Sequence, residues 1–151
     1  MRAVAAFLLA AVVFALDLWT KALVSRLPVG ESRPLLDGLV FLTHVRNPGA
    51  AFGMLAGRTG LFVALGVLVL VAMPFILRRT GDLLALLALG AVLGGAAGNL
   101  FDRLRTGLVT DFIDVRFWPV FNLADSAIVV GAIVLAWRLL FYPRRVMAGR
   151  G

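Results

Sequence analysis

Two aspartates, Asp111 and Asp125, lie beside and within the apolar segment 117–137. A lone carboxylate in an apolar segment must be neutral, paired or hydrated, because a bare charge is costly away from water. Two carboxylates that come close in such surroundings share a proton and titrate as a pair. One acid can then polarise an amide carbonyl while the other activates water. The pattern therefore predicts a catalytic dyad suited to peptide hydrolysis without a metal, serine or cysteine.

Other polar side chains recur at helical spacing near these acids. Asn122 lies three residues before Asp125, so both face the same way in a helix. Asn99 and Arg103 are four residues apart and also share a helix face. An arginine at such a junction can orient a carboxylate through two parallel hydrogen bonds, and an interfacial position is the alternative.

Two more groups are open to both a functional and a structural interpretation. Asp17 and Lys21 are four residues apart in an apolar stretch, where ionisable groups are functional suspects. A structural ion pair near the end of a helix explains them equally well. Asn47 opens the turn 47–53, and its side chain could bond both backbone and substrate. A plain loop is the alternative for that segment.

Different chemistries remain open for the acidic residues. A magnesium site for phosphoryl transfer to lipid would use three acids, with arginines nearby for phosphate: Asp111, Asp114 and Asp125, with Arg103, Arg105 and Arg116. A small polytopic transporter would line a polar path with Asp17, Lys21 and Asp125. A membrane scaffold is the remaining alternative, and several polar clusters placed toward one membrane face argue against it.

The elements that must position these residues follow from hydrophobicity. Hydrophobic residues make up 62% of the 151 residues and charged residues 15%, too few to cover a soluble globule. Because about 20 mostly apolar residues span a bilayer, we expect an all-α membrane protein in one domain, 1–151, with spans at 4–25, 59–77, 83–103 and 120–141. The first span reaches this length only by including Asp17 and Lys21, and we interpret it as a retained helix. Gly90, Gly94 and Gly98 predict close packing of the third helix.

Charge placement predicts the topology. Arginines flank the ends of the apolar runs, so the net charge of +7 indicates orientation in a membrane, with no nucleic-acid partner. Both termini and the Arg78–Arg79 loop are then cytoplasmic. The connection 27–58 alternates turn residues with β-prone runs, which predicts one or two hairpins on the outer surface, with His44 in a solvated loop. The connection 104–118 is expected to carry Asp111 in a loop and Asp114 as a solvated acid.

Five blocks of the sequence, taken in order, resemble the lipoprotein signal peptidase family, also called signal peptidase II. The blocks are Asp17-x-x-Thr20-Lys21, Asn47-x-Gly49-Ala-Ala-Phe-Gly53, Gly94-Gly95 through Gly98-Asn99 to Asp102-Arg103, Gly107-x-Val109-x-Asp111-Phe112, and Phe121-Asn122-x-Ala124-Asp125 running to Ile128. Each block alone is weak, but five in register with four spans are specific. The resemblance covers about residues 17–128, without a departure at a motif position.

The resemblance implies an aspartic protease of the bacterial inner membrane with four helices and a small extracytoplasmic β-rich cradle between the first two. Such enzymes remove the signal peptide from diacylglyceryl-modified prolipoproteins at the lipidated cysteine. It implies Asp111 and Asp125 as the catalytic acids and a site lined or supported by six residues: Asp17, Lys21, Asn47, Asn99, Arg103 and Asn122. It also implies no cofactor or metal. The expected partners are the prolipoprotein and membrane lipids, and we expect a monomer.

Overall fold

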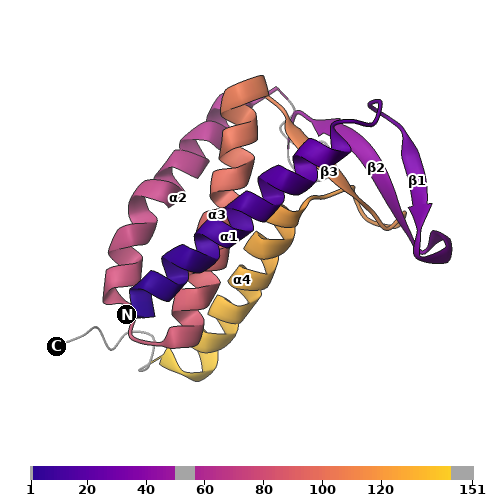
Figure 1. Ribbon diagram of the computed structural model, residues 1–151. Coiled ribbons are helices and arrows are strands. Elements are labelled where there is room, and N and C mark those ends of the chain that lie inside the picture. Colours follow the sequence, from indigo (N-terminus) through magenta and orange to yellow (C-terminus); the bar gives the residue numbers. More distant parts are fainter. Residues whose placement is uncertain (1, 50–56, 144–151) are drawn as a thin grey trace.

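Four long helices form the body of the molecule (Figure 1). The computed structural model describes residues 2–49 and 57–143. The helices are α1 (Arg2–Val24), α2 (Thr59–Arg79), α3 (Leu83–Thr106) and α4 (Leu123–Phe141). Each is long and apolar enough to cross a membrane. Together with a small sheet, they confirm the predicted fold class.

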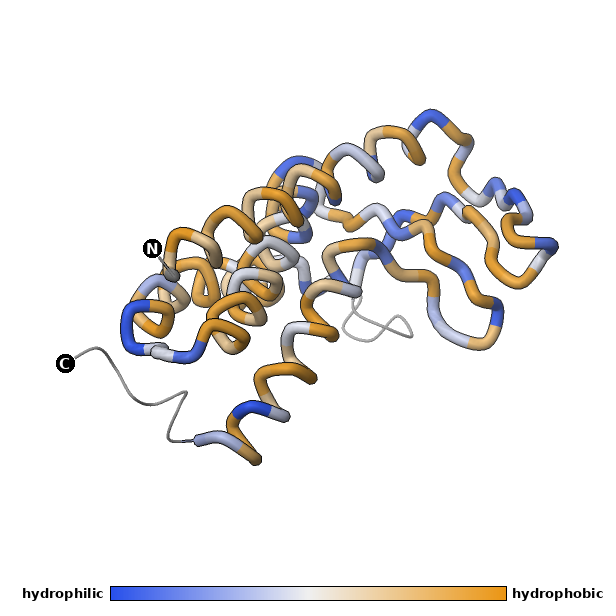
Figure 2. Tube along the Cα trace, turned by 60° about the horizontal axis from the view of Figure 1, so that its bottom comes forward, coloured by the Kyte–Doolittle hydropathy of each residue, from blue (hydrophilic) through white to orange (hydrophobic). Residues whose placement is uncertain are grey.

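Helix α3 occupies the centre of the bundle, with the other helices packed around it (Figure 1). In its most apolar stretch 61% of the residues are buried, compared with 11–17% in the other three helices. The outer helices instead expose large apolar side chains, such as Leu68 and Ile133. Figure 2 shows that apolar residues dominate the helices, whereas polar residues gather at the bundle ends and along the sheet. This distribution suits a bundle whose outer surface faces lipid.

Glycines on α3 allow its neighbours to approach closely, as the sequence predicted. A Cβ atom at Gly90 would lie 2.4 Å from the Ala6 carbonyl oxygen of α1. One at Gly95 would lie 2.5 Å from the Ala124 carbonyl oxygen of α4. Since such distances are far below van der Waals contact, the small residues set how near both helices can come.

Substitution of Gly95 by alanine should separate α3 from α4. The new methyl group would meet the backbone next to Asp125, and overpacking of this kind costs about 1–3 kcal/mol. We expect a lower unfolding temperature in detergent and slower substrate cleavage. Gly60→Ala is the matched control, because a Cβ atom there meets nothing within 4 Å. Equal stability of the two variants would contradict the close packing of α3 against α4.

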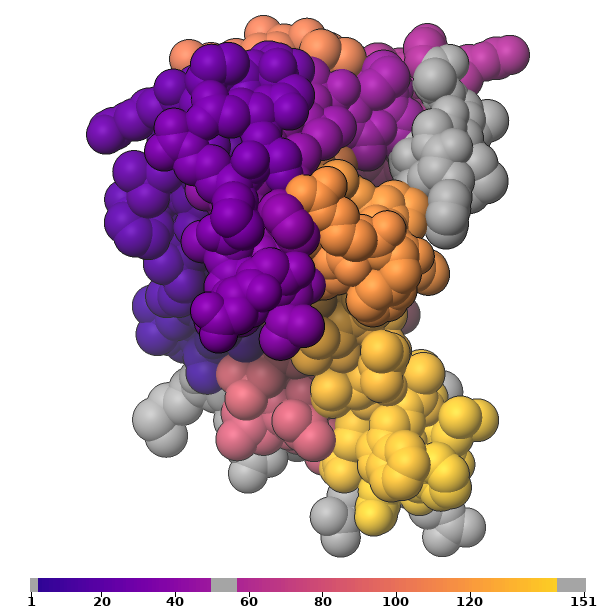
Figure 3. All heavy atoms as spheres, turned by 90° about the vertical axis from the view of Figure 1, so that its right-hand side faces the viewer, coloured from indigo at the N-terminus to yellow at the C-terminus, as the bar shows by residue number. Residues whose placement is uncertain are grey.

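A three-stranded antiparallel sheet lies at one end of the bundle. Strands β1 (Ser32–Leu35) and β2 (Val40–Asn47) form a hairpin around a 3-10 helix, Leu36–Gly38, and β3 (Val109–Asp114) pairs with the other edge of β2. Figure 3, viewed from this end, shows the hairpin beside the segment that carries β3. The hairpin was expected from the first connection. The third strand comes from the second connection, so Asp111 lies on a strand and the prediction of a loop there was wrong.

Two side chains predicted to be solvated are buried. Asp114 is 6% exposed and accepts hydrogen bonds from the Thr43 hydroxyl and the Arg116 backbone N–H, both at 2.8 Å. His44 lies on β2, is 4% exposed, and has its Nδ1 atom 2.7 Å from the Leu27 carbonyl oxygen. Both predictions failed because strand pairing brings distant backbone and hydroxyl groups to these side chains.

The bundle end opposite the sheet holds the start of α1, the α2–α3 connection and the end of α4 (Figure 1). Asp82 caps α3 there by accepting from the Ala85 backbone N–H at 2.9 Å, and it pairs with Arg138 of α4. The arginines that follow the last apolar run, Arg144, Arg145 and Arg150, lie outside the described residues. The ionisable network near Asp111 is thus at the sheet end, and the Arg78–Arg79 pair at the other.

Candidate active site

Asp111 and Asp125 line one cavity of about 350 Å³ where the sheet meets the ends of the helices. Asp111 is 1% exposed on β3, whereas Asp125 is half-buried in the first turn of α4. The remaining walls combine polar groups with apolar and aromatic side chains from β2, β3, α3 and α4, from the residue Gly49 after β2, and from the β3–α4 connection. They are Asn47, Gly49, Asn99, Arg103, Val109, Trp118, Pro119, Val120, Phe121 and Val129. The structure thus brings the two acids that sequence reasoning selected into one site.

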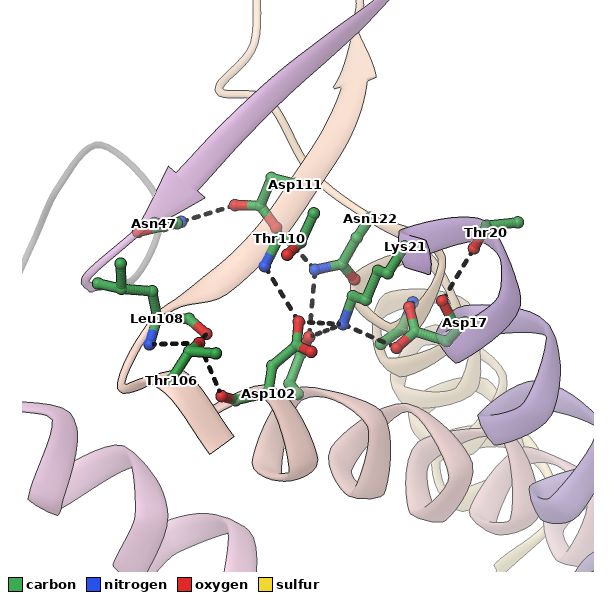
Figure 4. A network of polar contacts seen from close by, with 12 residues as sticks. Asp17, Thr20, Lys21, Asn47, Asp102, Thr106, Leu108, Thr110, Asp111 and Asn122 are labelled. Atoms are coloured by element: carbon green, nitrogen blue, oxygen red, sulfur yellow. Dashed lines mark hydrogen bonds and ion pairs between the residues drawn. The ribbon is translucent and has the colours of Figure 1, made fainter. Parts of the chain in front are cut away.

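Two amide side chains hold the Asp111 carboxylate. Asn47 donates from Nδ2 to Oδ2 at 2.8 Å, and Asn122 donates from Nδ2 to Oδ1 at 2.7 Å. The sheet register explains the first contact, since Asp111 pairs with Val45 and Asn47 lies two residues further along β2. Figure 4 shows the Asn47–Asp111 bond bridging the two strands. Of the predicted segment 47–53, residues 50–53 lie outside the described residues.

The start of α4 fixes Asp125. Asn122 is the N-cap: its Oδ1 accepts from the Asp125 backbone N–H at 2.8 Å, while Asp125 Oδ2 accepts from the Asn122 backbone N–H at 3.2 Å. This reciprocal capping box satisfies two helix-end donors and locks the turn. Asn99 of α3 donates to Asp125 Oδ1 at 2.7 Å. Because Asn122 also bonds Asp111, a single asparagine links both acids.

Burial sets the electrostatics of Asp111. Loss of water contact, together with the nearby Asp125 charge, raises the pKa of Asp111 from 3.8 to about 6. The hydrogen bonds from Asn47 and Asn122 act in the opposite direction and limit the rise. Asp111 therefore titrates close to neutral pH, where a carboxyl group can exchange protons with a substrate.

This raised pKa predicts a pH-dependent stability. The folded protein keeps a proton on Asp111 up to about pH 6, whereas an unfolded aspartate releases it near 3.8, so protonation favours folding. The contribution is complete below about pH 4 and is lost as the pH rises through about 6, at most about 3 kcal/mol. Wild-type protein should gain thermal stability in detergent relative to Asp111→Asn between about pH 7 and about pH 4.5. The same pH dependence in both proteins would contradict the burial effect.

Lys21 stands at the centre of a second polar network behind the acids (Figure 4). Its Nζ atom lies 2.7 Å from Asp17 Oδ2 and 3.2 Å from Asp102 Oδ2, and it donates to Asn99 Oδ1 at 2.9 Å. Asp17 and Lys21 are 0% and 3% exposed, so the pair is buried between helices and does not reach solvent. The sequence left open a functional and a structural interpretation of this pair. The contacts favour the structural one, in which the pair supports the site.

The same network anchors neighbouring elements. Asp17 Oδ1 accepts from the Ala124 backbone N–H at 3.0 Å, one residue before Asp125. Asp102 Oδ2 accepts from the Thr110 backbone N–H at 3.0 Å, one residue before Asp111. The two carboxylates around Lys21 thus hold the backbone beside each of the two acids. Sequence reasoning missed the contact between Asp102 and Thr110, because no spacing rule links α3 to the strand after it.

Arg103 joins the site through the backbone. Its Nη2 atom donates to the Gly49 carbonyl oxygen at 3.0 Å, and its guanidinium lies 4.6 Å from the centre of the Phe62 ring of α2. The sequence had suggested that Arg103 orients a carboxylate through two parallel hydrogen bonds. Among the described residues it makes no such contact. Its position links the residue Gly49 after β2 to α2 and α3, and its side chain forms part of the cavity wall.

The three acids that the magnesium site would require do not come together. The Asp114 carboxylate contacts Thr43 and Arg116, away from Asp111 and Asp125. Within 2–49 and 57–143, no three histidine, aspartate or glutamate side chains come together as metal ligands. The described residues therefore offer two carboxylates to a reaction at this cavity.

Sequence comparison places the chain in a known family. The family model described as signal peptidase (SPase) II matches residues 9–141, which include both acids. The lipoprotein signal peptidase of Pelotomaculum thermopropionicum is 50% identical over 137 residues, covering 89% of this chain and 90% of the relative. That of Moorella thermoacetica is 48% identical over 136 residues, covering 88% and 91%. The resemblance drawn from the five sequence blocks is confirmed.

Two solved structures of bacterial membrane enzymes, both obtained by the in meso method, share the fold. The one at 2.3 Å resolution has a TM-score of 0.85 at 32% identity and covers 89% of this chain and 87% of that chain. The one at 1.9 Å has a TM-score of 0.82 at 31% identity and covers 91% and 93%. With these matches in sequence and fold, the chain belongs to the signal peptidase II family of lipoprotein-processing membrane proteases.

Proposed function

We propose that the chain removes the signal peptide from diacylglyceryl-modified prolipoproteins at the lipidated cysteine, with Asp111 and Asp125 as an aspartic dyad. The observation that carries this proposal is that both acids line one cavity and are linked through Asn122. Two carboxylates with different surroundings can divide the roles of acid and base. No cofactor enters the reaction as we propose it.

Asp111 acts as the acid of the pair, because burial raises its pKa to about 6, close enough to neutral pH for the group to take up and release a proton. The Asp125 carboxylate takes a proton from water, and the resulting hydroxide bonds to the scissile carbonyl carbon. Protonated Asp111 stabilises the carbonyl oxygen as charge develops there. When the C–N bond breaks, the leaving nitrogen receives the proton from the dyad, giving a free carboxylate on the signal peptide and a free amine on the cysteine.

The cavity walls suit a substrate held in the bilayer. Trp118, Val120 and Val129 give the cavity an apolar side next to α4, against which a signal helix and its lipid could dock. Anchoring of this kind turns a chance encounter into positioning at the bond. We propose a monomer in the bacterial inner membrane with cytoplasmic termini. The basic pair Arg78–Arg79, at the end opposite the sheet, supports an extracytoplasmic site by the positive-inside rule.

A purified system tests the substrate assignment. The protein in detergent is mixed with a prolipoprotein carrying the diacylglyceryl group, and the same precursor without the lipid serves as control. We expect cleavage of the lipidated precursor only, with mass spectrometry identifying the modified cysteine as the new N-terminus. Cleavage at another bond, or equal cleavage of both precursors, would overturn the assignment.

A further inference from the structure

A second and larger cavity, of about 560 Å³, lies where α1 and α3 end against the sheet. It shares no lining residue with the cavity that holds the two acids. Figure 4 shows four of its lining residues: Lys21, Asp102, Thr106 and Thr110. Its volume lies within the range of roughly 300–1,000 Å³ that is usual for ligand sites. Neither the dyad nor the proposed docking of a signal helix uses it.

Two arginines give this cavity an excess of positive charge. Lys21 and Asp102 also line it, but Lys21 is shared between Asp102 and Asp17, so this network adds no positive charge and the excess comes from the arginines. Arg46 of β2 donates to the Thr110 hydroxyl at 2.8 Å, and Arg105 is exposed in the last turn of α3. Among residues 2–49 and 57–143, neither arginine has a carboxylate partner in an ion pair. Guanidinium groups of this kind bind phosphate oxygens through paired hydrogen bonds.

The helix ends at this cavity do not supply hydrogen-bond donors for a phosphate. Helices α1 and α3 both end at the cavity, so they present carbonyl groups there and not the N–H groups of a helix start. An anion in this cavity would therefore depend on the two arginine side chains, with the Thr110 hydroxyl, which accepts from Arg46, as a neutral donor nearby.

The other side of the cavity is apolar. Leu18, Ala22 and Phe101 line it, and Leu104 on the same turn of α3 as Phe101 is 66% exposed. Trp19, the residue after Leu18 on α1, is 60% exposed, and tryptophan is enriched at the lipid–water interface in membrane proteins. A cavity that joins a cationic end to a lipid-facing helix surface matches an amphipathic ligand.

We propose that this cavity binds the phosphate headgroup of an anionic phospholipid, held by Arg46 and Arg105, with the acyl chains along the exposed apolar faces of α1 and α3. Such a lipid would join strand β2 to the end of α3, since one arginine comes from each. The proposal is independent of the dyad, because it concerns a different cavity and is tested by binding.

Native mass spectrometry of the full-length protein in nonionic detergent tests it, with phosphatidylglycerol and phosphatidylcholine added at equal concentration. Wild-type protein should retain phosphatidylglycerol in preference. Each of Arg46→Gln and Arg105→Gln should weaken that preference about fivefold, and the double variant about 25-fold. Arg26→Gln is the matched control, because Arg26 is an exposed cation at the same end of α1 that does not line the cavity. It should retain the wild-type preference.

An unchanged preference in Arg105→Gln and the double variant would overturn the proposal, as would an equal loss in Arg26→Gln, which would indicate general surface charge. Inorganic phosphate that displaces the lipid at equal concentration would identify a soluble anion as the ligand instead. Arg105→Gln guards against misfolding, since Arg105 is exposed and should leave the unfolding temperature unchanged.

Discussion

Asp111→Asn and Asp125→Asn should each reduce cleavage of the lipidated precursor by at least about 10³-fold. Asparagine keeps the shape of aspartate, but it neither accepts a proton from water nor donates one to a leaving amine. The surrounding amides can still bond to it, so both variants should remain folded in the membrane. Single-turnover cleavage with saturating enzyme measures the chemical step without the effect of product release.

Asp114→Asn is the matched control for this loss. It makes the same chemical change on the same strand, three residues from Asp111, where the side chain bonds Thr43 and Arg116 outside the catalytic cavity. We expect its cleavage rate to stay within a few-fold of wild type, because its ion pair with half-exposed Arg116 is worth at most about 1 kcal/mol. Near-normal turnover by either dyad variant, or complete loss in Asp114→Asn, would mean that the catalytic acids are assigned wrongly.

Lys21→Met should cause the largest loss of stability. Lys21 is the cation shared by Asp17 and Asp102, and its removal leaves one buried and one partly buried carboxylate without a counter-charge. Breaking a buried ion pair in this way costs about 3–5 kcal/mol. Because those carboxylates hold the backbone at Ala124 and Thr110, the dyad should lose its geometry as well. Unfolding followed in detergent with increasing denaturant measures the change.

Two further variants separate charge balance from a loss of packing. Arg26→Met removes an exposed cation from the same helix and should be close to neutral. Asp17→Asn combined with Lys21→Met removes a buried charge of each sign, so it should recover part of the stability lost in Lys21→Met alone. If Lys21→Met were as stable as Arg26→Met but inactive, Lys21 would act in the reaction and not as a structural cation.

The sequence predicted the helices and the acids for the same physical reason. Apolar segments of spanning length have few stable structures in a bilayer other than a helix, so the four spans were readable from hydrophobicity alone. A charged residue in such a segment is costly, which singled out Asp17, Lys21 and Asp125. The glycine spacing on α3 likewise predicted close helix packing, since few other features call for small residues at every fourth position.

Pairings between distant segments could not be predicted in this way. Strand β3 carries three polar residues, Thr110, Asp111 and Asp114, which hide its strand pattern until β2 is placed beside it. The partners of Asp102 and Asp114 depend on that pairing, and the burial of His44 depends on the segment after α1, where its ring meets the Leu27 carbonyl oxygen. Hydrophobicity and helical spacing describe one element at a time, whereas these contacts depend on which strand edge meets which helix end.

The most direct test of the dyad is the cleavage rate of the purified protein on lipid-modified prolipoprotein after exhaustive treatment with EDTA. Our account predicts an unchanged rate, because water is activated by Asp125 and the carbonyl is assisted by Asp111. A rate that falls to background in EDTA and returns on addition of a divalent cation would contradict it, and would make these carboxylates metal ligands.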